Sequence, residues 1–214
     1  MTKTLLFDTP LDERIHRPPA RVLAALLAKT PITPNQVTLL SLVPAFFSGV
    51  LFLHGSFQGG LLALFFFWLW AVLDHTDGEL ARLTNSTSSF GQKLDDLCDH
   101  IASISIFCGI FFGLLPFWNT KDKFILEIIF SAVLVLNIIS LTLVTTAKRN
   151  SQKKHAALDN LTGRDLFYLL ILFVLTAFFW GGPLWFSFVM GVFIVGLFLV
   201  SALFLLSWLK ISQQ

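Results

Sequence analysis

The sequence predicts an all-α, polytopic membrane protein with six transmembrane helices and an N-terminal amphipathic helix at the membrane interface. Composition is the first reason: 55% of the 214 residues are hydrophobic, only 13% are charged, and the mean hydropathy is +0.76. This exceeds the apolar content of ordinary soluble domains. The second reason is length, because several apolar runs reach the ~20 residues that a helix needs to cross a bilayer. A net charge of +2 is too small to indicate a nucleic-acid partner.

Residues 1–33 form the expected N-terminal arm. Residues 11–29 mix basic and apolar side chains, and Pro18 and Pro19 lie where a helix would begin. This pattern predicts an amphipathic juxtamembrane helix in the interface. No uninterrupted apolar core ends in a small-residue cleavage site, so we expect no secretory signal. Prolines end this helix, and we expect Asn35 to cap the next one.

Six apolar segments follow the arm and make up a six-helix core over residues 34–210, within one domain of residues 1–214. The expected spans are 35–54, 59–81, 92–117, 124–147, 165–181 and 184–209. Thirteen of the 15 Lys and Arg residues lie in the arm, in the 82–93 and 148–164 links or at the C-terminus. The positive-inside rule therefore places both termini and these links in the cytoplasm.

Four aspartates at the facing ends of the second and third expected spans predict a metal site. Asp74 and Asp77 are three residues apart, and Asp95 and Asp99 are four apart, so each pair lies on one face of its helix. A short turn can bring the two pairs together. Four carboxylates near a membrane boundary need a compensating cation. Oxygen ligands favour Mg²⁺, Mn²⁺ or Ca²⁺, and Mg²⁺ commonly binds carboxylates together with substrate phosphates.

Small and basic residues accompany the aspartates. Gly78, Ala81 and Gly91 leave room for a ligand, and Arg82 offers a guanidinium fork for phosphate oxygens. A divalent-cation transporter or channel is the alternative from another class of function, but its acids would usually lie nearer the midplane of the membrane. Such a protein would also make no use of the small residues and Arg82. The combined pattern favours a pocket facing the cytoplasm.

In full, the motif reads Asp74-x-x-Asp77-Gly78-x-x-Ala81-Arg82, eight further residues, then Gly91-x-x-x-Asp95-x-x-x-Asp99. It resembles the signature of the CDP-alcohol phosphotransferase (CDP-alcohol phosphatidyltransferase) family at every fixed position. The six expected spans, the N-terminal amphipathic helix and the Pro34-Asn35-x-x-Thr38 entry to the first span are also similar to that family. The resemblance covers most of the chain, although its specificity comes from residues 74–99.

The resemblance implies transfer of a substituted phosphate group from a CDP-alcohol to the hydroxyl of a second alcohol, with release of CMP. It implies Mg²⁺ or Mn²⁺ bound by Asp74, Asp77, Asp95 and Asp99, with Asp99 also the general base. It further places Gly78, Ala81, Arg82 and Gly91 beside the CMP moiety, and implies a homodimer. The donor alcohol can be lipid, as in CDP-diacylglycerol, or soluble. A homologue that binds nucleotide without turnover is a further alternative, disfavoured because no aspartate is missing.

The 148–164 link forms a second basic cluster on the same expected side as the aspartates. Lys148 and Arg149 would end the fourth span and Arg164 would begin the fifth, so they can line a pocket for a phosphorylated acceptor. The alternative is positive-inside topology with attraction to anionic lipid headgroups. His75 and His100, each next to an aspartate, can orient a carboxylate, contact a phosphate or pack between helices.

Overall fold

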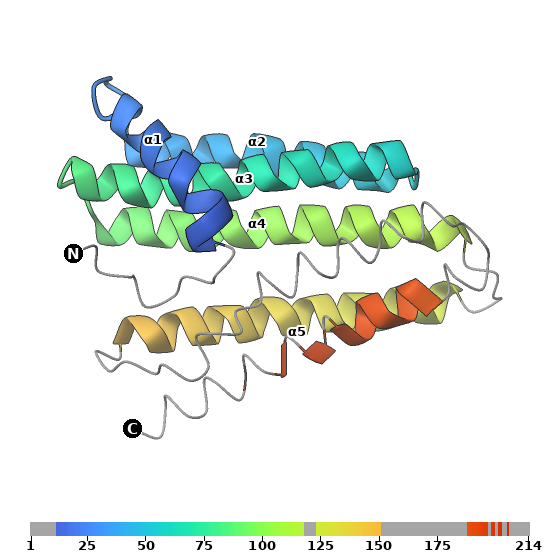
Figure 1. The fold of residues 1–214 in the computed structure, drawn as a ribbon. Helices are drawn as coiled ribbons and strands as arrows, with labels where there is room; N and C mark the ends of the chain where they lie inside the picture. The colour runs from blue at the N-terminus through green and yellow to red at the C-terminus, as the bar shows by residue number, and fades with distance from the viewer. Residues whose placement is uncertain are drawn as a thin grey trace. The chain divides into compact units, whose positions relative to one another are not determined.

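The structure, a computed structural model, describes residues 12–117, 123–150, 188–196, 198–199, 201–202 and 205 (Figure 1). Every regular element in these residues is a helix, which confirms the all-α prediction for this part of the chain. The chain divides into a compact unit of Pro10–Ile110 and a second unit that contains Phe111–Gln214. All the predicted motif residues from Asp74 to Asp99 belong to the first unit.

Among the described residues, three helices are long and apolar enough to cross a membrane. They are α2 (Pro34–Leu53), α3 (Phe57–Leu83) and α4 (Ser89–Leu114), the last followed by a 3-10 turn, Leu115–Phe117. They match the first three predicted spans, and α5 (Lys123–Asn150) covers the fourth. The predicted fifth span lies outside the described residues, and of the sixth, residues 188–196 are helical. The full set of six spans therefore stays a prediction.

A helix, α1 (Arg17–Leu27), lies within the predicted N-terminal stretch and follows a short π-helical turn, Asp12–His16, while its position in the membrane interface stays a prediction. Figure 1 shows α1 lying across α3, and the two helices are in contact. The buried face of α1 carries small residues: Ala20 and Ala24 are fully buried, and Ala24 joins Val37 of α2 and Leu80 of α3 in one apolar cluster. Small side chains let α1 pack closely on the two long helices beneath it.

The predicted cap of α2 was wrong, because Thr33 and not Asn35 caps this helix. Thr33 has the extended backbone of an N-cap, with φ −90° and ψ 154°. Its hydroxyl accepts a hydrogen bond from the Gln36 backbone, and the Gln36 side chain accepts one from the Thr33 N–H at 2.9 Å. This reciprocal capping box, with Pro34 at the first helical position, starts the helix before Asn35.

In the first unit, α2 and α4 approach so closely that glycine is required at the crossing. A Cβ on Gly49 would lie 2.5 Å from the carbonyl oxygen of Ser105, and a Cβ on Gly109 would overlap the backbone of Gly49. On another face of α2, the Ser48 hydroxyl donates to the carbonyl oxygen of Ala63 on α3 at 2.9 Å. Close backbone approach and interhelical hydrogen bonds are typical of helices packed within a bilayer.

In the second unit, aromatic stacking and a buried polar pair join the described helical segments. The ring of Phe130 on α5 stacks on Phe111 with centroids 4.0 Å apart, and lies 6.3 Å from the ring of Phe193. Asn137 donates a hydrogen bond to the hydroxyl of Ser201 at 3.2 Å, and both residues are buried. These contacts pair α5 with the helical residues around 188–202.

Candidate metal centre

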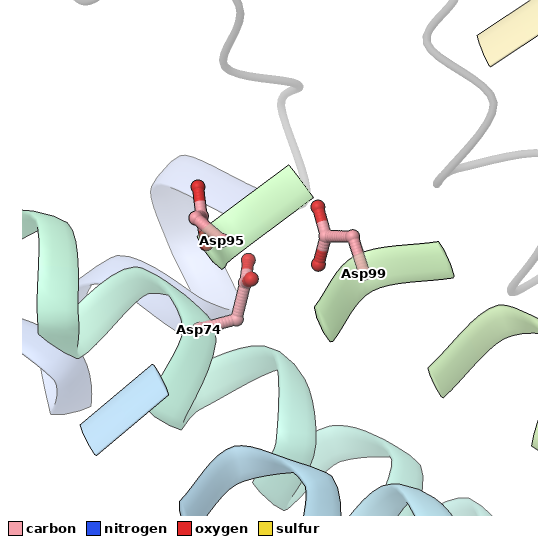
Figure 2. A group of neighbouring side chains, drawn as sticks. All are labelled: Asp74, Asp95 and Asp99. Atoms are coloured by element: carbon pink, nitrogen blue, oxygen red, sulfur yellow. The ribbon is translucent and has the colours of Figure 1, made fainter. Parts of the chain in front are cut away.

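Three of the four predicted metal ligands come together. Asp74 near the end of α3 points toward Asp95 and Asp99 near the start of α4, as Figure 2 shows, and one ligand oxygen from each lies within 4.8 Å of the others. All three residues are partly buried. Oxygens bound to one Mg²⁺ or Ca²⁺ lie about 2.0 to 2.6 Å from the ion, so this spacing fits a single divalent cation. The donor set of carboxylates alone also suits Mg²⁺ or Mn²⁺.

The turn between α3 and α4 brings these carboxylates face to face. Asn85 adopts a left-handed conformation with φ 51°, directly after the last residues of α3. The Ser86 N–H donates to the Ala81 carbonyl at 2.9 Å and the Asn85 N–H to the Arg82 carbonyl at 3.3 Å, which makes a Schellman motif. The Ser88 hydroxyl then accepts from the Gly91 N–H at 2.9 Å and caps α4. The chain thus reverses within residues 84–88.

Asp77, the fourth predicted ligand, turns toward α2 instead. Its carboxylate accepts a hydrogen bond from the hydroxyl of Thr38, and the two residues are only 6% and 4% exposed. The Thr38 hydroxyl also lies 3.1 Å from the carbonyl oxygen of Pro34. Asp77 is not part of the group formed by the other three aspartates among the described residues. Its role as a metal ligand stays a prediction.

The residues predicted to border CMP lie along the same face and turn. A Cβ on Gly78 would lie 3.5 Å and 3.6 Å from the terminal nitrogens of Arg82, so this guanidinium lies back over the glycine. A Cβ on Gly91 would lie 3.0 Å from the side-chain oxygen of Asn35, so Gly91 lets α4 approach α2. Ala81 is partly buried, and the side chain of Arg82 is 42% exposed. Their contact with a nucleotide stays a prediction.

Glu79 is the residue that the sequence reasoning missed. Its Oε1 atom accepts a hydrogen bond from Arg17 at 2.8 Å and lies 3.2 Å from Arg82 and 3.7 Å from Arg21. The carboxylate therefore faces three guanidinium groups from two helices. A signal for it was available, because an ionisable residue in a membrane helix is normally paired. The sequence offered no way to choose its partner from the many basic residues of the arm.

The two histidines beside the aspartates have different surroundings. His75 Nδ1 lies 4.0 Å from an oxygen of Asp74, and its ring centroid lies 5.9 Å from that of His16. His100 Nδ1 contacts the backbone oxygen of Asp96, one turn earlier in α4. The ring of His75 thus packs beside His16, the residue before α1, and the ring of His100 makes a contact within α4. A catalytic role for either histidine stays a prediction.

The predicted acceptor residues can be placed only in part. Lys148 and Arg149 belong to the C-terminal end of α5, where the structure describes the backbone alone. Arg164 lies outside the described residues.

Comparison with known sequences relates the chain to one family. The family model of CDP-alcohol phosphatidyltransferase matches residues 31–208. An archaetidylinositol phosphate synthase of Pyrococcus horikoshii is 34% identical over 107 residues, which are 50% of this chain and 54% of that protein. A phosphatidylinositol phosphate synthase of Mycobacteroides abscessus is 29% identical over 108 residues, 50% of this chain and 48% of that protein. The chain thus aligns with about half the length of these curated relatives.

Solved structures give the same relationship at the level of the fold. Phosphatidylinositol phosphate synthase of Mycobacterium tuberculosis in complex with manganese and citrate matches with a TM-score of 0.64 at 19% identity, over 91% of this chain and 87% of that one. The same enzyme with CDP-DAG bound matches with a TM-score of 0.62 at 20% identity, over 91% and 92% of the two chains. With three helices long and apolar enough to span a bilayer in the part that the structure describes, this chain is an integral membrane protein, and the family match over most of its length shows that it belongs to the CDP-alcohol phosphatidyltransferase family.

Proposed function

We propose that the chain transfers a substituted phosphate group from a CDP-alcohol to the hydroxyl of a second alcohol. The observation that carries this proposal is the meeting of Asp74, Asp95 and Asp99 within 4.8 Å, on the hairpin that also bears Arg82. The family match supports the reaction class. The solved relative with CDP-DAG bound supports a lipid donor such as CDP-diacylglycerol. Relatives named phosphatidylinositol phosphate synthase make inositol phosphate the first acceptor to test.

The reaction assigns a separate task to each group. Asp74, Asp77 and Asp95 would hold Mg²⁺ or Mn²⁺, and Asp99 would act as the general base and as a further ligand of the ion. When bound, the metal neutralises charge on the diphosphate of the donor. Asp99 removes the proton from the acceptor hydroxyl, and the acceptor oxygen forms a bond to the β-phosphorus. The bond from this phosphorus to the bridging oxygen breaks, and CMP leaves with that oxygen.

The donor's phosphates would lie against Arg82, because a guanidinium fork binds two phosphate oxygens at once. Gly78, Ala81 and Gly91 then border the CMP moiety and allow it to approach the helices closely. Lys148, Arg149 and Arg164 would hold the phosphate of the acceptor. We place this site, together with both termini, on the cytoplasmic face of a six-span homodimer.

We further place α1 in the membrane interface. Val22 and Leu26 are 63% and 59% exposed on its outer side, while Ala20 and Ala24 face the bundle. Exposed apolar residues beside the basic side chains of Arg21 and Lys29 are typical of a helix that lies among lipid headgroups.

The test is an acceptor panel with purified protein, CDP-diacylglycerol and Mn²⁺, scored by release of CMP. The panel compares inositol phosphate, glycerol phosphate and unphosphorylated inositol, with and without EDTA. We expect metal-dependent CMP release with one phosphorylated acceptor and none with the Asp95→Asn variant. No CMP release from any donor and acceptor pair, with protein that binds Mn²⁺ normally, would contradict the proposed reaction.

A further inference from the structure

The contacts of Glu79 connect the N-terminal helix to the arginine of the proposed donor site. One oxygen, Oε1, accepts a hydrogen bond from Nη1 of Arg17 at 2.8 Å and lies 3.2 Å from Nη2 of Arg82. The side chains of Arg17 and Glu79 are only 7% and 16% exposed, whereas that of Arg82 is 42% exposed. A charge-assisted hydrogen bond between two largely buried groups fixes the carboxylate firmly. The exposed guanidinium of Arg82 then has a fixed partner.

Arg17 is itself held in a defined register on α3. The preceding residue, His16, is fully buried, and its ring lies 5.9 Å from that of His75. His75 and Glu79 are four residues apart and lie on one face of α3. His16, the last residue of the π-helical turn, and Arg17, the first residue of α1, therefore meet two side chains one turn apart on α3. This pairing leaves little freedom for the start of α1 to shift along α3.

Gly78 leaves the helix surface beside Arg82 bare. The terminal nitrogens of Arg82 lie 3.5 Å and 3.6 Å from where a Cβ of residue 78 would be, so the guanidinium lies back along the helix. Helical side chains normally lean in this direction. Without Arg17, the carboxylate of Glu79 would keep only its looser contacts with Arg82 at 3.2 Å and Arg21 at 3.7 Å among the described residues, and ion pairs with such exposed guanidinium groups fix geometry only weakly.

We propose that Arg17 is a positioning residue for the donor site, because it acts through Glu79 to hold the guanidinium of Arg82 where the donor's phosphate groups bind. This inference rests on the proposed function, which makes a CDP-alcohol the ligand of Arg82. A consequence is that the packing of α1 against α3 affects the affinity for the donor. Loosening the start of α1 raises the KM for the donor and leaves the proton transfer at Asp99 unchanged.

The test is a double-mutant cycle between Arg17→Gln and Glu79→Gln, assayed by CMP release with CDP-diacylglycerol as donor. We expect each single variant to raise the KM for the donor about fivefold, since the released side chain of Arg82 must then be ordered when the donor binds. The double variant should be no worse than either single one, because both break the same connection. The value of kcat and the KM for the acceptor should stay within about twofold. Assays at about 0.5 M salt screen the change in net charge.

Arg14→Gln is the matched control, because it removes the same charge from an exposed position three residues earlier. It should leave all three kinetic parameters unchanged. Arg17→Lys keeps the charge but loses the fork, and it should give a smaller rise in the KM for the donor. If Arg17→Gln does not fold, Arg17→Lys replaces it in the cycle.

The outcomes separate this inference from the proposed function. Wild-type turnover with an unchanged donor KM in Arg17→Gln overturns the inference and leaves the function standing. Additive effects of Arg17→Gln and Glu79→Gln, or an equal effect of Arg14→Gln, also overturn it. If the wild-type protein releases no CMP from any donor, the proposed function fails and the inference falls with it.

Discussion

Thr38 of α2 donates a hydrogen bond from its hydroxyl to the buried carboxylate of Asp77 on α3. This contact holds Asp77 against α2, whereas Asp95 and Asp99 belong to α4. The first membrane-capable helix thus helps to orient the motif, although it supplies none of the clustered aspartates.

Replacing Thr38 with valine should lower the rate of CMP release about tenfold or more. A hydrogen bond to a charged group is worth roughly 1.5 to 3 kcal/mol, and its loss frees the Asp77 carboxylate to turn away from its present position. Thr38→Ser keeps the hydroxyl and should retain most activity. Ser41→Ala removes a buried hydroxyl whose hydrogen bond among the described residues stays within α2, to the backbone carbonyl of Thr38 at 2.7 Å, and it serves as the control. Equal losses in Thr38→Ser and Thr38→Val would show that packing and not the hydrogen bond matters.

Asp99→Asn should abolish transfer while most of the binding of CMP and Mn²⁺ is kept, because the proposal assigns Asp99 first to proton removal and only secondarily to the ion, whereas Asp77 and Asp95 are assigned to the ion alone. The amide keeps the shape and an oxygen ligand, but it cannot accept a proton from the acceptor hydroxyl. Asp77→Asn should be the more severe change for metal and nucleotide binding. Calorimetry with CMP and Mn²⁺ measures both. Equal loss of binding in the two variants would remove the reason for calling Asp99 the base.

Asp95→Asn should weaken Mn²⁺ binding by roughly tenfold or more, because the affinity of an oxygen-ligand site depends on the number of charged ligands. Electron paramagnetic resonance of free Mn²⁺ measures the dissociation constant directly. Asp96→Asn changes the neighbouring residue, which lies outside the three-aspartate group, and is the matched control. If both variants bind Mn²⁺ like the wild type, the cluster of Asp74, Asp95 and Asp99 is not the metal site.

Gly109→Ala should destabilise the protein by about 1 to 3 kcal/mol, the usual cost of extra volume in a closely packed interface. The added methyl would overlap the backbone of Gly49, so α2 and α4 would have to separate. Gly191→Ala is the control, because a Cβ there meets nothing within 4 Å. Thermal unfolding in detergent compares the two. Melting temperatures that fall equally would show that the α2 and α4 crossing is not specially tight.

Arg164→Ala should raise the KM for a phosphorylated acceptor by roughly tenfold and leave the KM for CDP-diacylglycerol within twofold. The arginine is expected to bind the acceptor's phosphate through charge-assisted hydrogen bonds. Steady-state kinetics with each substrate varied in turn distinguishes the two effects. Equal changes for donor and acceptor would reject Arg164 as an acceptor residue.

Periodicity, hydropathy and one motif were enough to predict the helical class, the first three spans and the meeting of Asp74 with Asp95 and Asp99. These features follow from local rules: apolar run length sets the spans, and three- or four-residue spacing sets the face of a helix. The choice of partner by a side chain does not follow such rules. The carboxylate of Asp77 faces Thr38 because α2 packs against α3 beside Asp77. The spacing of residues along α3 cannot reveal such a tertiary contact.

The prediction for the cap of α2 failed for a different, local reason. Asn35 is a good capping residue in isolation, but Thr33 with Gln36 three residues later forms a reciprocal capping box, a pattern that the sequence itself shows. The partners of Glu79, in contrast, could not be read from the sequence, because they depend on where α1 lies on α3.

The tight turn at Asn85 also has a consequence for the order in which the protein is made. Because one helical hairpin carries all the motif aspartates between residues 74 and 99, the ligands are neighbours along the chain, and closing the loop between them costs little conformational entropy. Local contacts of this kind form early, and chains fold from the N-terminal end as they are synthesised. If a cation binds at Asp74, Asp95 and Asp99 as proposed, all three of these ligands are present once α3 and α4 have formed, so its binding does not have to wait for α5.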